Sequence, residues 1–227
     1  MHEPSSPAAT MIDLNHQAPF AAGYNRTCYR HPDDPRLCLK VLRPENIEAR
    51  FARQPWYKKL LGRDRINDNR QEIIAHRQIA ALADPQQAWR HLPRFHGSID
   101  TTLGPANVSE LITETDGQPG TTLERYLEHN GRTTEVERAI GQFADWLRQT
   151  GLLTRNLLPH NLVLARRDDR LTLYLVDGLG APTVPTRLTT IPAYRSRYIA
   201  RKLARFRQRI DWEIRGRPGS WTRAEKL

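Results

Sequence analysis

Two oxygen-bearing side chains, Asn161 and Asp177, stand at the ends of short apolar runs, and their chemistry suits a magnesium ion. Magnesium prefers oxygen ligands, usually keeps several waters, and takes only one or two protein groups together with phosphate oxygens. An amide carbonyl and a carboxylate meet that need, so the pair predicts a magnesium site that carries a phosphorylated ligand. The alternative is a pair of turn residues, because Asn and Asp-Gly are common turn formers.

The spacing around this pair is that of a protein-kinase catalytic loop and its downstream metal-binding turn. In the pattern H-R-D-L-x-x-x-N the Asp receives the substrate proton and the Asn holds magnesium. A later Asp holds magnesium on the ATP phosphates. Arg155, Leu157, Asn161 and Asp177 stand in register with this pattern, but Asn156 takes the place of the proton-accepting Asp. The sequence therefore predicts an ATP site more clearly than an active kinase.

Asn156 limits the chemistry that we expect. A carboxamide does not accept a proton near neutral pH, although its carbonyl can orient a hydroxyl group. General-base assistance typically contributes about 10²–10⁴-fold to a rate, whereas phosphoryl transfer depends mainly on positioning and electrostatics. With Asn156 and Asp177 as the catalytic residues, we expect slow or altered transfer.

Lys40 interrupts the apolar run Leu37–Leu42, and a Lys is costly to bury unpaired. If this run is the third strand of an ATP-binding sheet, the ammonium can pair with the α- and β-phosphates and with a helix Glu, for which Glu72 is the best candidate. The alternative is a Lys that snorkels from an edge strand. Gly23 falls where a phosphate-covering loop is expected, and Arg26 is predicted either to contact phosphate or to be exposed.

The elements that must position these residues follow an α+β order, with strands first and helices later. We expect strands around Lys40, a helix from Asp68 to about Leu82, two more strands, two helices, a hairpin and a C-terminal helix. This order predicts a β-rich lobe followed by a mainly helical lobe. The predicted segments are a disordered 1–15, an N-lobe at 16–114 with an insert at 43–67, and a helical C-lobe at 115–227. The insert is either a small flap or a partner-binding helix.

Length and composition bound the class of protein. A chain of 227 residues fits one domain or two small lobes. No segment reaches the roughly 18 apolar residues that a membrane span needs, and Met1–His16 lacks the basic head and apolar run of a secretory signal. We therefore expect a cytoplasmic protein. Cys28 and Cys38 are expected to face each other across a hairpin as reduced thiols.

The net charge of +10 is concentrated at the C-terminus, where residues 187–227 hold twelve Lys/Arg and three Asp/Glu. A basic helix on a near-neutral body suggests an anionic partner, such as a membrane surface, nucleic acid or an acidic protein. The alternative is a solvated helix face. Within Tyr198–Arg207 the apolar and basic residues fall on different faces, as in surface-binding helices. Packing of Leu203 and Phe206 onto the helical lobe explains the same pattern.

Several further segments carry a family resemblance. They are Arg26–Asp34 leading into Cys38–Lys40, then Leu92–Gly97, and the positions Leu157, Pro159, Asn161, Asp177 and Gly180. Together, over roughly residues 17–210, they resemble the YrbL family, bacterial proteins named for the PhoP regulatory network and grouped with protein-kinase-like folds. The resemblance implies a compact kinase-like two-lobe fold and nucleotide binding. It carries over Lys40, Asn161 and Asp177 as the nucleotide and metal residues.

These observations predict a kinase-like protein that binds ATP with Mg²⁺ between two small lobes and transfers phosphate to an unknown acceptor. Lys40 would hold phosphates, Glu72 would orient Lys40, Asn161 and Asp177 would hold the metal, and Asn156 would position the acceptor. Two alternatives stay open. One is a pseudokinase, a regulatory binding module that acts through its basic C-terminal helix or the insert. The other is a nucleotidyl transferase that moves AMP.

Overall fold

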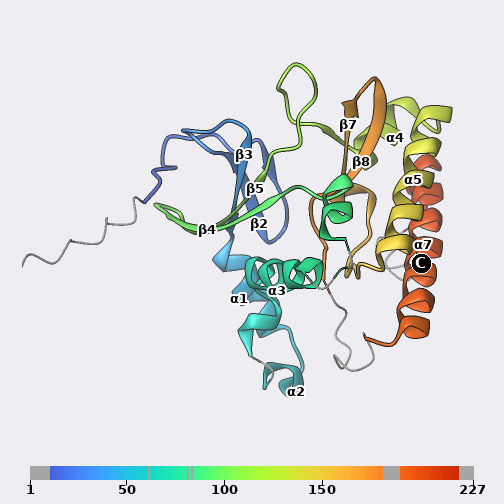
Figure 1. The fold of residues 1–227 in the computed structure, drawn as a ribbon. Coiled ribbons are helices and arrows are strands. Elements are labelled where there is room, and N and C mark those ends of the chain that lie inside the picture. Colours follow the sequence, from blue (N-terminus) through green and yellow to red (C-terminus); the bar gives the residue numbers. More distant parts are fainter. Residues whose placement is uncertain (1–10, 61, 81, 83, 181–189, 220–227) are drawn as a thin grey trace, which may run out of the picture. The chain divides into compact units, whose positions relative to one another are not determined.

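The apolar run around Lys40 forms one strand of a five-stranded antiparallel sheet in the computed structural model (Figure 1). The strands are β1 (Ala21–Ala22), β2 (Arg26–Arg30), β3 (Leu37–Leu42), β4 (Phe95–Thr101) and β5 (Gly104–Glu110). Their spatial order is β1-β2-β3-β5-β4. The strand that carries Lys40 is therefore central, with β2 hydrogen-bonded on one side and β5 on the other.

The structure describes residues 11–60, 62–80, 82, 84–180 and 190–219. The chain divides into two compact units, one containing residues up to Gln71 together with Phe95–Leu111, the other containing Glu72–Arg94 together with residues from Ile112 onward. The sequence placed residues 72–94 in the first lobe. The structure groups them with the second unit, where His91 exchanges backbone and side-chain hydrogen bonds with strand β8 (Arg170–Leu175).

The N-terminal segment predicted as disordered, residues 1–15, differs from that prediction where it is described. Residues 1–10 lie outside the described part of the chain. The Ile12 carbonyl accepts a hydrogen bond from the Thr102 N–H at 2.9 Å, and the Leu14 N–H donates to Thr102 Oγ1 at 2.9 Å. Both apolar side chains are buried against one face of the sheet, because alternate residues of an extended segment point to the same side.

Helices follow the third strand. The predicted insert contains α1 (Pro44–Ala52) and α2 (Trp56–Lys59), with the side chains of Trp56, Tyr57 and Leu60 exposed. Helix α3 (Asp68–Ala80) comes next and begins at the residue expected from the sequence. Whether the insert acts as a flap or as a partner-binding helix stays a prediction.

The second unit combines a small sheet with helices. Strands β6 (Thr121–Thr122), β7 (Leu162–Arg167) and β8 form a three-stranded antiparallel sheet. Helices α4 (Leu123–Asn130) and α5 (Thr134–Thr150) precede the β7–β8 hairpin, and α7 (Pro192–Ile214) follows it near the end of the described residues. The Thr133 side chain caps α5 by accepting from the Val136 N–H, and Gly151 ends it in the left-handed conformation, as expected for helix ends.

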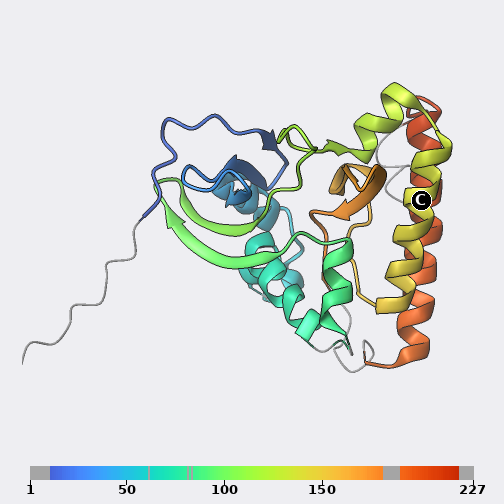
Figure 2. The same ribbon diagram turned by 45° about the horizontal axis from the view of Figure 1, so that its top comes forward.

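Helix α7 lies beside α5, as both views show (Figures 1 and 2). Its apolar face is buried in the core of the second unit. The buried apolar residues are Tyr198, Ile199, Leu203, Phe206 and Ile210. The packing explanation for Leu203 and Phe206 is therefore confirmed, and only the basic side of the helix is left to meet a partner.

The two cysteines do not face each other. Cys28 pairs with Lys40 across the β2–β3 hairpin, and Cys38 pairs with Arg30. The predicted register was wrong because the connection between the strands sets the pairing, and here that connection spans residues 31–36. Neither cysteine forms a disulfide within the described part of the chain.

The order of elements agrees with the kinase pattern. Lys40 lies on the third strand and Glu72 on the next long helix, and Asn161 and Asp177 flank the β7–β8 hairpin. The predicted α+β class and kinase-like layout are confirmed by this order.

Candidate functional site

Lys40 is only 5% exposed, although it is a charged residue in the middle of a sheet. Its central position excludes snorkelling from an edge strand. Its cross-strand neighbours are Cys28 and Asn107, and this face also carries the buried side chains of Arg26 and Ser109. Burying polar groups is costly unless they are hydrogen-bonded. This face of the sheet is therefore built for polar contacts.

Asn69, in the first turn of α3, joins the helix to the polar face of the sheet. Its Nδ2 donates to the Lys40 carbonyl at 2.9 Å, and its own carbonyl accepts from Asn107 Nδ2 at 3.0 Å. Asn107 Oδ1 in turn accepts from the Ser98 hydroxyl at 2.9 Å. The start of α3 and the strand that carries Lys40 are thus held in one arrangement. Sequence patterns alone do not identify Asn69, but an Asn inside the apolar run of β5 was a usable signal for Asn107.

Arg26 and Gly23 lie at the β1–β2 connection. Arg26 is 5% exposed, and its Nη1 lies 3.5 Å from Asn69 Oδ1, so the exposed alternative for Arg26 is wrong. The Gly23 N–H donates to the Arg26 carbonyl at 2.8 Å, and a Cβ at this position would meet only that carbonyl, at 3.7 Å. This turn therefore does not require glycine. Phosphate binding by either residue stays a prediction.

In the second unit, backbone pairing brings Asn156 and Asp177 together. The N–H groups of Arg155 and Asn156 both donate to the Gly178 carbonyl, at 2.7 and 3.4 Å. The segment that precedes β7 is thereby fixed to the turn that follows β8. The two catalytic residues proposed from sequence thus belong to one locally bonded structure.

Asn161 connects to both segments. Its Nδ2 donates to the Asn156 carbonyl at 3.0 Å, and its carbonyl accepts from the Val176 N–H at 3.0 Å. With the amide nitrogen used in this way, Oδ1 is the side-chain atom suited to a metal. Asp177 Oδ1 accepts from the Gly178 N–H at 2.5 Å. An amide oxygen and a carboxylate from adjoining segments fit the oxygen donor set of magnesium.

Gly178 is required by this geometry. Its φ of +84° lies in the region that side-chain-bearing residues rarely adopt. A Cβ would lie 2.4 Å from the Asn156 carbonyl oxygen and 3.2 Å from Asn161 Nδ2. The close approach of the two segments thus depends on the missing side chain.

Three side chains of helix α7 donate hydrogen bonds to the chain just before Asn156. Arg195 Nη2 donates to the Gly151 carbonyl at 2.6 Å, and the Tyr198 hydroxyl donates to the Thr154 carbonyl at 2.8 Å. The Lys202 ammonium donates to the Arg155 carbonyl. Residues at positions i, i+3 and i+7 share one helix face, so a single face of α7 supports the loop.

Burial changes the titration of two of these donors. Burial raises the pKa of Tyr198 from 10.0 to about 12, because the phenolate would lose solvation. Burial also lowers the pKa of Lys202, and the nearby positive charges of Arg205 and Arg201 lower it further. Both shifts disfavour the charged form of a group that supports the loop.

Glu72 is 8% exposed on α3. It belongs to the second compact unit and Lys40 to the first. The pairing of Lys40 with Glu72 therefore stays a prediction, as does the joint action of Lys40 and Asp177 on one ligand.

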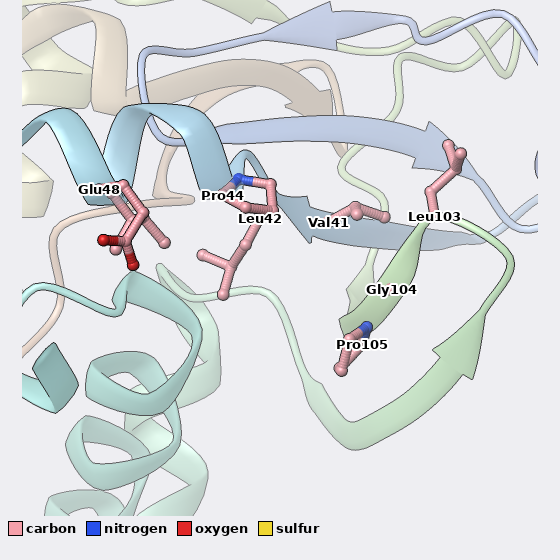
Figure 3. A pocket seen from close by; sticks show the side chains of 8 residues that line it. Val41, Leu42, Pro44, Glu48, Leu103, Gly104 and Pro105 are labelled. Carbon is pink, nitrogen blue, oxygen red and sulfur yellow. The ribbon is translucent and has the colours of Figure 1, made fainter.

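A pocket of about 190 Å³ lies within the first unit (Figure 3). Its lining is mainly apolar and comes from the end of β3, the start of α1 and the β4–β5 turn. The lining residues are Val41, Leu42, Pro44, Ile47, Glu48, Leu103, Gly104 and Pro105. None of the predicted site residues lines it, and its volume is below the roughly 300–1,000 Å³ that ligand pockets usually have.

No helix in the described ranges is both long and apolar enough to cross a membrane. Residues 12–211 match the family model of "PhoP regulatory network protein YrbL", which confirms the resemblance found in the sequence. YrbL of Escherichia coli (strain K12), an uncharacterized protein, is 27% identical over 180 residues, covering 77% of this chain and 76% of that protein. YrbL of Shigella flexneri gives the same values.

Two solved kinase domains are also similar to this chain. The BubR1 kinase domain has a TM-score of 0.45 and 13% identity, with 78% of this chain and 52% of that chain covered. This chain thus spans about half of that structure. A mutant of the Mycobacterium tuberculosis PknI kinase domain has a TM-score of 0.45 and 18% identity, with 89% and 74% covered.

We expect Gly178→Ala to lower the free energy of unfolding by about 2 kcal/mol or more, through backbone strain and a clash with the Asn156 carbonyl. Gly141→Ala is the matched control, because Gly141 lies inside α5 with no atom within 4 Å of a new Cβ. That substitution should stabilise by about 0.5–1 kcal/mol. Urea unfolding of both variants measures the difference. Equal effects of the two substitutions would show that the Gly178 turn is not constrained.

We expect an absorbance titration to show one tyrosine that ionises near pH 12, against an ordinary pKa of 10.0, and Tyr198→Phe to remove that step. A group whose pKa is raised on folding stabilises the protein fully below its unfolded pKa and loses that effect as pH rises through the folded pKa. The contribution of Tyr198 should therefore disappear between about pH 10 and pH 12. Tyr57→Phe, which removes an exposed phenol, should leave this late step in place. A titration without it would contradict the buried hydrogen bond to Thr154.

Proposed function

This chain belongs to the YrbL family of PhoP regulatory network proteins, and we propose that it binds ATP with magnesium and catalyses slow or specialised phosphotransfer. The observation that supports this most is the local structure around Gly178, in which the Asn156 segment and the Asp177 turn share backbone hydrogen bonds. Phosphoryl transfer needs little covalent work from the protein and depends on where groups are held. A loop that is held by these hydrogen bonds and carries an amide and a carboxylate meets that requirement.

Each residue has a distinct role in this proposal. Asn161 and Asp177 would hold the magnesium ion, which when bound neutralises charge on the phosphates. The Lys40 ammonium would pair with the α- and β-phosphates, and Glu72 would orient it. Arg26 and Gly23 would lie near the phosphate-covering turn. Asn69 would act indirectly, because it fixes the backbone of the strand that carries Lys40.

Asn156 would position the acceptor rather than deprotonate it. Its backbone N–H and carbonyl are both used to hold the loop, and its side chain is exposed. A carbonyl oxygen can accept a hydrogen bond from a hydroxyl group without taking the proton. Transfer would then lack general-base assistance, which is typically worth about 10²–10⁴-fold.

Thermal unfolding with ATP tests the nucleotide site. We expect ATP with magnesium to stabilise the protein more than ATP with a chelator, because a ligand that binds only the folded state adds about 2.7 kcal/mol at 100 times its Kd. Asp177→Asn should remove the magnesium-dependent part. Asp145→Asn, the same change on the exposed side of α5, should leave it intact. No stabilisation of the unaltered protein at millimolar ATP would contradict nucleotide binding.

Introducing a carboxylate at position 156 tests whether Asn156 stands where a general base would act. We expect Asn156→Asp to raise the rate of γ-phosphate transfer or release by about 10²-fold or more. Asn130→Asp, an identical change at the exposed end of α4, should not alter the rate. Assays with α-labelled and γ-labelled ATP follow the two parts of the nucleotide. Transfer of the α-label would indicate a nucleotidyl transferase, and ATP binding without transfer in any variant would indicate a pseudokinase.

A further inference from the structure

One turn of α7 gathers positive charge around the ring of Tyr198. The Arg201 guanidinium lies 5.4 Å and the Lys202 ammonium 5.5 Å from the ring centre. Arg205 follows one helical turn after Arg201, and both arginines are exposed. The helix contains no Asp or Glu before Asp211. The turn therefore carries a local excess of positive charge.

This charge is not neutralised within the described part of the chain, where no carboxylate forms an ion pair with Arg201 or Arg205. Other arginines of the same unit are paired: Arg132 with Glu137 and Asp211, Arg166 with Glu135, and Arg217 with Glu124 and Glu213. The arginines also act on Lys202, whose pKa is lowered by burial first and then by Arg205 and Arg201. Like charges held close together are unfavourable unless an anion joins them.

The cluster lies beside the candidate catalytic loop in the same unit. The Tyr198 hydroxyl bonds to the Thr154 carbonyl and the Lys202 ammonium to the Arg155 carbonyl. Asn156 is the next residue along the chain. An anion held by Arg201 and Arg205 would therefore lie near the side chain that we assign to the acceptor.

We propose that Arg201 and Arg205 bind a phosphate group carried by the acceptor, which places an acceptor hydroxyl next to Asn156. Guanidinium groups match phosphate oxygens in geometry and make strong charge-assisted hydrogen bonds. Positions i and i+4 lie about 5–6 Å apart between Cβ atoms, a spacing that suits one compact dianion. A long polyanion would need a longer row of exposed cations: the row includes exposed Arg197 one turn before Arg201, but it ends at Arg209, which is buried.

This inference rests on the proposed function for its chemical step. The acceptor hydroxyl oxygen would form a bond to the γ-phosphorus of ATP as the bond from that phosphorus to ADP breaks. The hydroxyl proton would pass to water, because a carboxamide does not take it. Lys202 and Tyr198 act as positioning residues, since they hold the loop through its backbone.

Phosphate binding is tested without ATP. We compare thermal stability in sodium phosphate and in sodium chloride of equal ionic strength, and expect phosphate to raise the melting temperature. The double variant Arg201→Gln/Arg205→Gln should weaken phosphate binding by about tenfold or more. Arg207→Gln/Arg215→Gln removes two exposed charges from the same end of the chain and should keep the response. An equal response in chloride, or an equal loss in both double variants, would overturn the proposal.

Further probes separate the sources of the phosphate. Binding of glycerol 1-phosphate would indicate a soluble acceptor, and binding to phosphatidylcholine vesicles only when they contain phosphatidic acid would indicate a lipid. Either result supports the proposal if it depends on Arg201 and Arg205. Tighter binding to single-stranded DNA or polyglutamate, with no response to the phosphate monoesters, would contradict it. The ATP experiment is separate: phosphate binding without ATP binding would reject only the proposed function, and ATP binding without phosphate binding only this inference.

Discussion

The candidate site depends on one carbonyl group, that of Gly178, which accepts hydrogen bonds from two consecutive backbone N–H groups. The left-handed φ of this residue and its lack of a Cβ allow the Asn156 carbonyl to approach it closely. That carbonyl in turn binds the Asn161 amide. A lost hydrogen bond that leaves a buried polar group unsatisfied costs about 1–3 kcal/mol. The positions of the three polar side chains are therefore consequences of a single backbone turn.

Helix α7 extends this constraint outward. Its three donors bind carbonyls of the segment 151–155, which has no regular secondary structure to satisfy them. Burial of two of these donors raises the pKa of Tyr198 and lowers the pKa of Lys202. The same helix thus does two things. Its inner polar residues hold the loop, while Arg201 and Arg205 are exposed and form no ion pair with a carboxylate of the described residues.

The features that follow from local sequence were predictable. The apolar run Leu37–Leu42 located the β3 strand, helical periodicity located α5, and motif spacing identified Asn161 and Asp177, which lie on adjoining segments. The features that were not predictable depend on distant pairing. The register that pairs Cys28 with Lys40 is set by the connection between the two strands, and residue propensities do not specify the length of that connection. The burial of Ile12 and Leu14 requires an apolar sheet face on which these side chains can pack. The burial of Arg26 was not predictable either, because its hydrogen-bond partner Asn69 lies 43 positions away in the sequence.

At Asn156 the structural role of the backbone can be distinguished from the chemical role of the side chain. Its backbone makes the hydrogen bonds that define the loop, but its carboxamide forms no hydrogen bond with any other described residue. The exposed side chain therefore contributes little to folding, and an Asp of the same shape would fit without rearrangement. Folding alone does not explain why an amide stands there. An amide leaves the site one negative charge weaker than an Asp would. Beside a carboxylate that would hold magnesium, this lowers repulsion toward an acceptor that carries its own phosphate. The anionic acceptor that we propose would explain both the amide of Asn156 and the positive charge on α7.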